Sequence, residues 1–162
     1  MPIVKNATHN FLKLRREIIS RSEGDLWSDA RGEWRLVNVF FAEEPQTCLC
    51  GHNPIIECCV LYNAQTGAEA IVGNVCVNRF LNLPSAKLFP AFDRIRRDPE
   101  RALNAAAIEF AFDRGWINDW EREFYLDTRT KRLLSDRQLS KRVEINRGVL
   151  SKLGATRKAV SI

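Results

Sequence analysis

The chain has 162 residues, a length that suits one domain or one core with an appended module. Hydrophobic residues make up 45% of it and charged residues 28%, which excludes a disordered tail or a fibre. No apolar run reaches the ~20 residues needed to cross a bilayer, and the first residues lack the pattern of a secretion signal. We therefore expect a cytoplasmic protein with no membrane partner.

The net charge of +5 is distributed unevenly along the chain. Residues 1–85 hold 8 basic and 9 acidic side chains, whereas residues 86–162 hold 17 basic and 11 acidic ones. The excess is concentrated between residues 128 and 158, which contain ten lysines and arginines and only two carboxylates, Asp136 and Glu144. The last of these basic residues are Arg157 and Lys158. A basic stretch of this kind favours an acidic partner.

The first half of the chain predicts two helices and three strands. Apolar residues at helical spacing indicate an amphipathic helix over residues 10–20. The aromatic and β-branched stretch 34–41 is typical of a strand, and the apolar run 55–62 indicates a second one. A turn of hairpin composition then leads into a third strand over 68–75, and residue 77 begins another helix.

Five cysteines lie within one 29-residue window, at positions 48, 50, 58, 59 and 76. Disulfides rarely persist in a reducing cytosol, so clustered thiols there more often bind a metal or carry redox chemistry. The window contains a tight turn at Cys48-Leu-Cys50-Gly51-His52, then the hairpin, then Cys76 at the start of a helix. This order of knuckle, hairpin and helix is the general plan of a treble-clef zinc finger.

The residue types in this window suit Zn²⁺, which prefers four thiolate or imidazole ligands at tetrahedral angles. Cys48, Cys50 and Cys76 supply three thiolates, and His52 is the best fourth candidate. Cys58 or Cys59 could replace His52, but these neighbours point to opposite faces of a strand, and we interpret them as small buried core residues.

A catalytic role has less support from the sequence. The chain lacks a Gly-rich phosphate loop, a nucleophile elbow and a His-Glu-x-x-His motif. The enzyme that the sequence still allows is a metal-dependent nuclease, which would need several helical carboxylates to converge in one cleft. Those carboxylates are Glu109, Asp113, Asp119, Glu121, Glu123 and Asp127. We expect a protein that is not an enzyme.

The cysteine window resembles a small zinc-binding module found in phage, prophage and bacterial proteins. The resemblance covers about a quarter of the chain, and this sequence has one residue fewer between the first two cysteines than the module's Cys-x-x-Cys-Gly-His knuckle. It implies zinc binding, an association with nucleic acid, and a bacterial cell or phage-infected host. The matching residues are Cys48-Leu-Cys50-Gly51-His52, Ile56, Tyr62-Asn63, Thr66-Gly67, Val72-Gly73, Cys76 and Phe80.

The second half of the chain predicts helices. Residues 84–90 have the composition of a short connection, and Pro99 with Glu100 is typical of a helix start. Capping patterns at Asn118 and Ser135 predict two further helices. The last of these has an apolar stripe and a stop at Gly154; the stripe consists of Leu139, Val143, Asn146, Leu150 and Leu153.

The basic residues of these helices are candidate phosphate contacts. An array of Arg and Lys gains affinity for DNA or RNA by releasing counterions, without reading bases. An acidic protein surface would meet the same array, so an accessory or inhibitor protein is the alternative function. The candidate residues are Arg129, Lys131, Arg132, Arg137, Lys141, Arg142, Arg147 and Lys152.

Together these patterns predict an α+β protein with three parts. Residues 1–33 form an N-terminal helix and linker, residues 34–82 form the treble-clef-like zinc module, and residues 83–162 form a basic helical region packed on it. The expected function is binding of nucleic acid, DNA or RNA, by a fold that Zn²⁺ stabilises.

Overall fold

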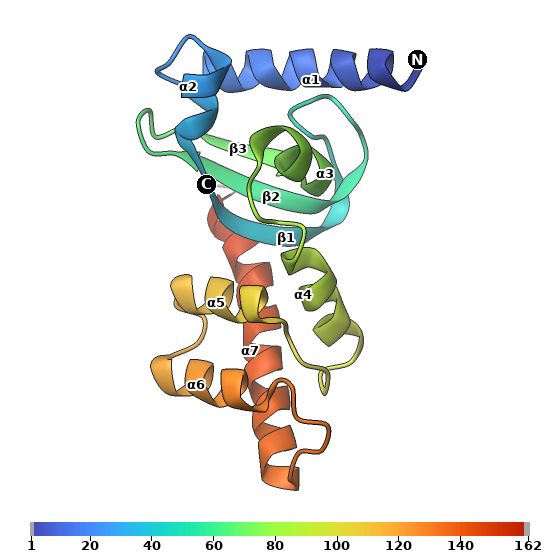
Figure 1. The fold of residues 1–162 in the computed structure, drawn as a ribbon, viewed down its shortest axis with the longest axis vertical. Helices are drawn as coiled ribbons and strands as arrows, with labels where there is room; N and C mark the ends of the chain where they lie inside the picture. Colours follow the sequence, from blue (N-terminus) through green and yellow to red (C-terminus); the bar gives the residue numbers. More distant parts are fainter. Residues whose placement is uncertain (1, 161–162) are drawn as a thin grey trace. The chain divides into compact units, whose positions relative to one another are not determined.

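The computed structural model describes the backbone of residues 2–160 and the side chains of residues 9–153. The described residues form an α+β structure with one three-stranded antiparallel sheet and seven α-helices (Figure 1). The chain divides into two compact units, residues 1–85 and residues 86–162. None of the described helices has both the length and the apolar character of a membrane span.

The sheet lies in the first unit and has the strand order β1-β2-β3. Its strands are β1 (Trp34–Gln46), β2 (Ile55–Asn63) and β3 (Glu69–Gly73). The three predicted strands are therefore confirmed, although β1 extends further than the sequence pattern indicated. The register pairs Phe40 with Cys58 across β1 and β2, and Cys58 with Gly73 across β2 and β3.

The hairpin between β2 and β3 closes on Asn63. Its side-chain oxygen accepts hydrogen bonds from the amides of Gln65, at 2.7 Å, and Thr66, at 3.1 Å. Gly67 has a φ of 75°, a left-handed conformation that glycine adopts at little cost. The turn fixes the register of the two strands and thereby the position at which β3 ends.

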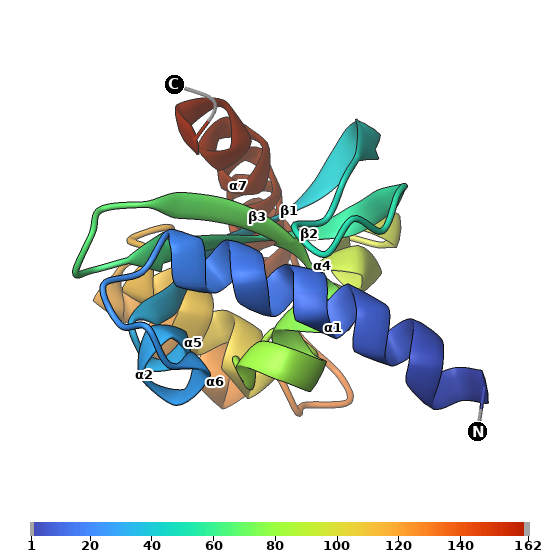
Figure 2. The same ribbon diagram turned by 90° about the horizontal axis from the view of Figure 1, so that it is seen from above.

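Two helices lie next to the sheet in this unit (Figures 1 and 2). They are α1 (Pro2–Ser20) and α2 (Trp27–Gly32). Leu14 and Ile18 of α1 are fully buried, as the amphipathic pattern predicts. Beyond β3, the chain forms one helical turn, α3 (Asn74–Cys76), that continues into the π-helical turn η1 (Val77–Leu81).

The second unit is helical. It contains α4 (Leu88–Arg97), α5 (Ala105–Asp113), α6 (Asp119–Thr128) and α7 (Asp136–Val160). The two predicted caps are confirmed. Asn118 and Glu121 exchange hydrogen bonds at the start of α6, and Ser135 and Gln138 do so before α7.

Three helix predictions for this unit are wrong. Helix α4 begins inside the segment 84–90, which the sequence analysis assigned to a connection, and continues to Arg97 over residues that it assigned to no element. Pro90 lies in the first helical turn, where proline is tolerated. No helix begins at Glu100; instead α5 begins after Asn104, whose side chain accepts a hydrogen bond from the amide of Ala107. Helix α7 also does not stop at Gly154.

Candidate metal centre and basic surface

Cys48 and Cys50 lie in the tight turn that connects β1 to β2. The amide of Cys48 donates to the carbonyl of His52 at 2.9 Å, and the amide of Gly51 donates to the carbonyl of Cys48 at 2.8 Å. Gly51 has a φ of 94°, which L side chains rarely adopt. The turn therefore needs glycine at this position in order to direct both cysteine side chains to the same side.

Cys76 lies beside Cys48 and Cys50, because the end of β3 lies next to the start of β2 at the open end of the hairpin. Strand β3 ends at Gly73, and Cys76 lies on the helical turn that follows. This turn is fixed by a polar network in which Asn78 donates to the side-chain oxygen of Asn74 at 2.7 Å and to the hydroxyl of Ser85 at 2.8 Å. The register of the hairpin thus determines where Cys76 lies.

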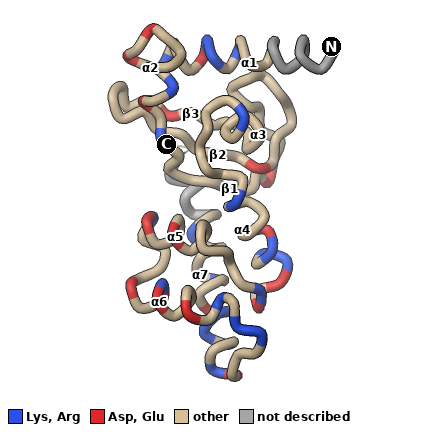
Figure 3. Tube along the Cα trace, viewed as in Figure 1, with Lys and Arg blue, Asp and Glu red and all other residues tan. Residues whose placement is uncertain are grey.

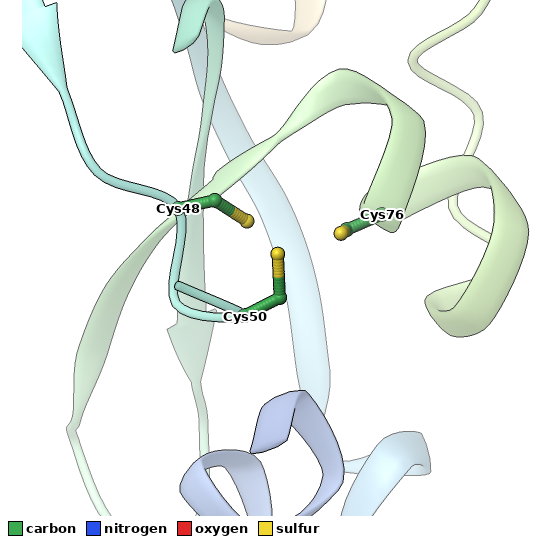
Figure 4. Close-up of side chains that lie close together, drawn as sticks. All are labelled: Cys48, Cys50 and Cys76. Atoms are coloured by element: carbon green, nitrogen blue, oxygen red, sulfur yellow. The ribbon is translucent and has the colours of Figure 1, made fainter. Parts of the chain in front are cut away.

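The three thiols converge (Figure 4). The Sγ atoms of Cys48, Cys50 and Cys76 all lie within 4.8 Å of one another, and the residues are only 3%, 2% and 9% exposed. Thiolates at 2.3 Å from a tetrahedral zinc ion would be about 3.8 Å apart. In the part of the chain that the structure describes, this is the only group of three His, Cys, Asp or Glu side chains close enough to hold one ion.

The environment of Cys48 stabilises its thiolate. A hydrogen bond from the Cys76 thiol, together with backbone amides, lowers the pKa of Cys48 to about 5. The same hydrogen bond raises the pKa of Cys76, which has to give up its proton beside an existing thiolate. Burial raises the pKa of Cys50. Deprotonation of all three thiols at this separation would therefore need a cation between them.

The structure does not bring His52 into this group. The residue is exposed, and its contribution to the turn comes from its backbone, whose amide donates to the Sγ of Cys50 at 3.4 Å. His52 instead lines a cavity of about 410 Å³ beside the thiols, together with Asn10, Ile56, Glu57 and Phe80.

Cys58 and Cys59 do not join the group either. Both are fully buried in β2, which confirms their interpretation as core residues. Burial raises the pKa of Cys58 to about 11 and that of Cys59 to about 12, so both remain protonated at neutral pH. A protonated thiol is a poor metal ligand.

Most of the candidate phosphate contacts lie on the surface of the second unit. Arg129, Lys131 and Arg132 occupy the segment between α6 and α7, where Figure 3 shows basic residues close together. Arg137, Lys141, Arg147 and Lys152 lie on α7, and of these Arg137, Arg147 and Lys152 are exposed. The side chains of Arg157 and Lys158 lie outside the described residues.

The prediction that Arg142 contacts phosphate is wrong, because its side chain is not on the surface. It is only 7% exposed, and its guanidinium donates to the carbonyl of Thr128 at 2.8 Å and to that of Glu100 at 3.3 Å. The predicted stripe of α7 is wrong in part, although Asn146 and Leu153 are buried as predicted. Leu139, Val143 and Leu150 are partly exposed, and the buried face consists of Arg142, Ile145, Asn146, Val149 and Leu153.

The helical carboxylates do not converge on an ion site within the described residues. Glu109 instead forms an ion pair with Arg122, with an N–O distance of 2.8 Å. Sequence reasoning also missed three arginines, Arg94, Arg96 and Arg97, that the unpredicted helix α4 carries in its last turn. Their signal was the helical spacing of Phe89, Phe92 and Ile95.

Comparisons with protein-family models, curated proteins and solved structures find no match to this chain.

Proposed function

We propose that this chain is a nucleic-acid-binding protein whose first unit is stabilised by Zn²⁺. The observation that carries the metal part is the convergence of three buried thiols from two ends of a hairpin. Zinc is the ion that this donor set favours, since soft thiolates select Zn²⁺ over Mg²⁺ or Ca²⁺. The arrangement of a knuckle before β2, the β2–β3 hairpin and a helical turn that carries Cys76 supports a treble-clef-like module.

His52 completes the coordination in this proposal. It lies two residues after Cys50 and lines the cavity next to the thiols, which supports it as the fourth ligand. A fourth protein ligand closes the coordination sphere, as in structural zinc sites, whereas catalytic zinc keeps one position for water. The metal would then hold the β1–β2 turn against the end of β3.

The nucleic-acid part rests on the charge of the second unit. Arg129, Lys131, Arg132 and Arg137 are partly or fully exposed, and no ion pair of the described side chains involves them. Exposed cations that have no carboxylate to neutralise them gain affinity for a phosphate backbone by releasing its counterions.

A salt titration of binding tests this function. We expect the full chain, loaded with zinc, to bind single- or double-stranded DNA or RNA, with log affinity falling linearly against log salt. R129Q/R132Q should reduce that slope by roughly 0.7–0.9 for each contact removed. R15Q/R16Q, which removes the same charge from exposed positions on α1, is the matched control. If no nucleic acid binds at low salt and an acidic host protein binds instead, the accessory or inhibitor function replaces this proposal.

A further inference from the structure

The buried Arg142 joins two loops that are far apart in sequence. One guanidinium donates to the carbonyl of Glu100, in the α4–α5 loop, and to the carbonyl of Thr128, at the end of α6. Asn146, one turn further along α7, donates to the carbonyls of Pro99 and Arg101 at 2.7 and 2.9 Å. The α4–α5 loop and the start of the α6–α7 loop therefore lie side by side on α7.

No carboxylate neutralises this buried charge among the described residues. The partners of Arg142 are two carbonyls and the ring of Tyr125, whose centroid is 5.8 Å from the guanidinium carbon, and its Nε has no hydrogen-bond partner. A buried cation without a counter-ion is costly, and its field is screened less than that of a surface charge. It adds positive potential to the surface above it.

The two loops carry exposed cations on that surface. The loops themselves, residues 98–104 and 129–135, contain four arginines and lysines against the two carboxylates Asp98 and Glu100. The last turn of α4, which precedes the first loop, adds Arg94, Arg96 and Arg97, and Figure 3 shows basic residues on both segments. Asp93 pairs with Arg96 and Arg97, so those two arginines are already engaged. Arg142 donates to the carbonyls of Glu100 and Thr128. The residue after each of these is an arginine: Arg101, which is exposed, follows Glu100, and Arg129 follows Thr128.

We propose that these two loops form one binding surface for the phosphate backbone of a nucleic acid. Arg101, from the α4–α5 loop, contacts phosphate together with Arg129, Lys131 and Arg132 from the α6–α7 loop. Arg142 is a positioning residue that holds the two loops at a fixed separation and touches no phosphate. This inference rests on the proposed nucleic-acid function and adds to it a second segment and a reason for the burial of Arg142.

Charge reversal in the added loop tests the surface. We expect R101E to lower the affinity of the zinc-loaded full chain for a DNA duplex and to reduce the salt slope by about 0.9 or more. R15E, the same reversal at an exposed position of α1, should leave both unchanged. If R101E behaves like R15E while R129E/R132E loses affinity, the two-loop surface is wrong and the nucleic-acid function stands. If the unaltered protein binds no duplex or single strand at low salt, both proposals fail.

A conservative variant separates the positioning role of Arg142 from its charge. Lysine keeps the charge but lacks the planar fork that donates to two carbonyls at once. We expect R142K to lower affinity while the salt slope stays the same, because the phosphate contacts still form but the loops must be ordered on binding. Circular dichroism confirms that the variant is folded at the temperature of the assay. Unchanged affinity in folded R142K would overturn the positioning role.

Discussion

The Sγ atom of Cys48 accepts a hydrogen bond from the backbone amide of Gly73 at 3.2 Å. This contact links the knuckle before β2 to the last residue of β3, three positions before Cys76. A Cβ at residue 73 would lie 3.3 Å from the Cγ2 of Ile55 and 3.8 Å from the Sγ of Cys48. Sheet register and thiol position are thus set by the same few atoms.

The two histidines of the chain offer a matched test of the fourth ligand. If His52 completes the zinc site, H52A should weaken zinc affinity by at least about tenfold, since it removes a direct ligand and even outer-shell partners contribute 10–100-fold. H9A should leave the affinity unchanged, because His9 is exposed and outside the thiol group. Competition with a chromogenic chelator measures both. Equal affinities for the two variants would show that His52 is not a ligand.

The hydroxyl of Tyr125 contributes to the stability of the second unit through two buried hydrogen bonds. It accepts from the amide of Leu103 at 2.9 Å and donates to the side-chain oxygen of Asn146 at 2.7 Å, in a fully buried position. Y125F leaves both partners unsatisfied, so we expect the free energy of unfolding to fall by about 1–3 kcal/mol. Urea denaturation measures the change. Y62F, at the half-buried Tyr62, is the control and should change stability by less than about 0.5 kcal/mol.

Glu33 predicts a pH-dependent contribution to stability. The amides of Glu23 and Gly24 and the side-chain amide of Asn63 donate to its carboxylate and hold its pKa below the ordinary value of 4.5. A carboxyl whose folded pKa is lowered stabilises the fold above its unfolded pKa, and the contribution is lost as pH falls through the folded value.

We therefore expect E33Q to be less stable than the unaltered protein near pH 7, with the difference shrinking below about pH 4.5. Thermal denaturation at a series of pH values measures it. E44Q, at an exposed position of β1, controls for the loss of one negative charge. A difference for E33Q that is the same at pH 7 and pH 3.5 would contradict the assigned hydrogen bonds.

The features that the sequence predicted correctly are those set by local chemistry. The turn residues of the hairpin, the apolar run of β2 and the capping residues Asn118 and Ser135 all act within a few positions along the chain. The grouping of Cys48, Cys50 and Cys76 followed from them, because a hairpin of known register returns Cys76 to the knuckle.

The features that it missed depend on tertiary partners. Arginine is a residue type that usually lies on the surface. The burial of Arg142 depends on the carbonyls of two distant loops, which accept its hydrogen bonds. Once Arg142 faces inward, the buried stripe of α7 shifts away from Leu139 and Val143. Helix α4 was hidden by Pro90, since the sequence does not show whether a proline lies in a first turn or a loop.

The metal content of the purified protein tests the central claim most directly. We expect one zinc ion per chain by emission spectroscopy, lost in C76S and retained in C58A, whose thiol is buried outside the group. Structural zinc contributes about 10–16 kcal/mol of apparent binding free energy in small peptides, so a chelator should unfold the first unit of the unaltered protein. A chain that contains no zinc and keeps its full stability in chelator would contradict the account.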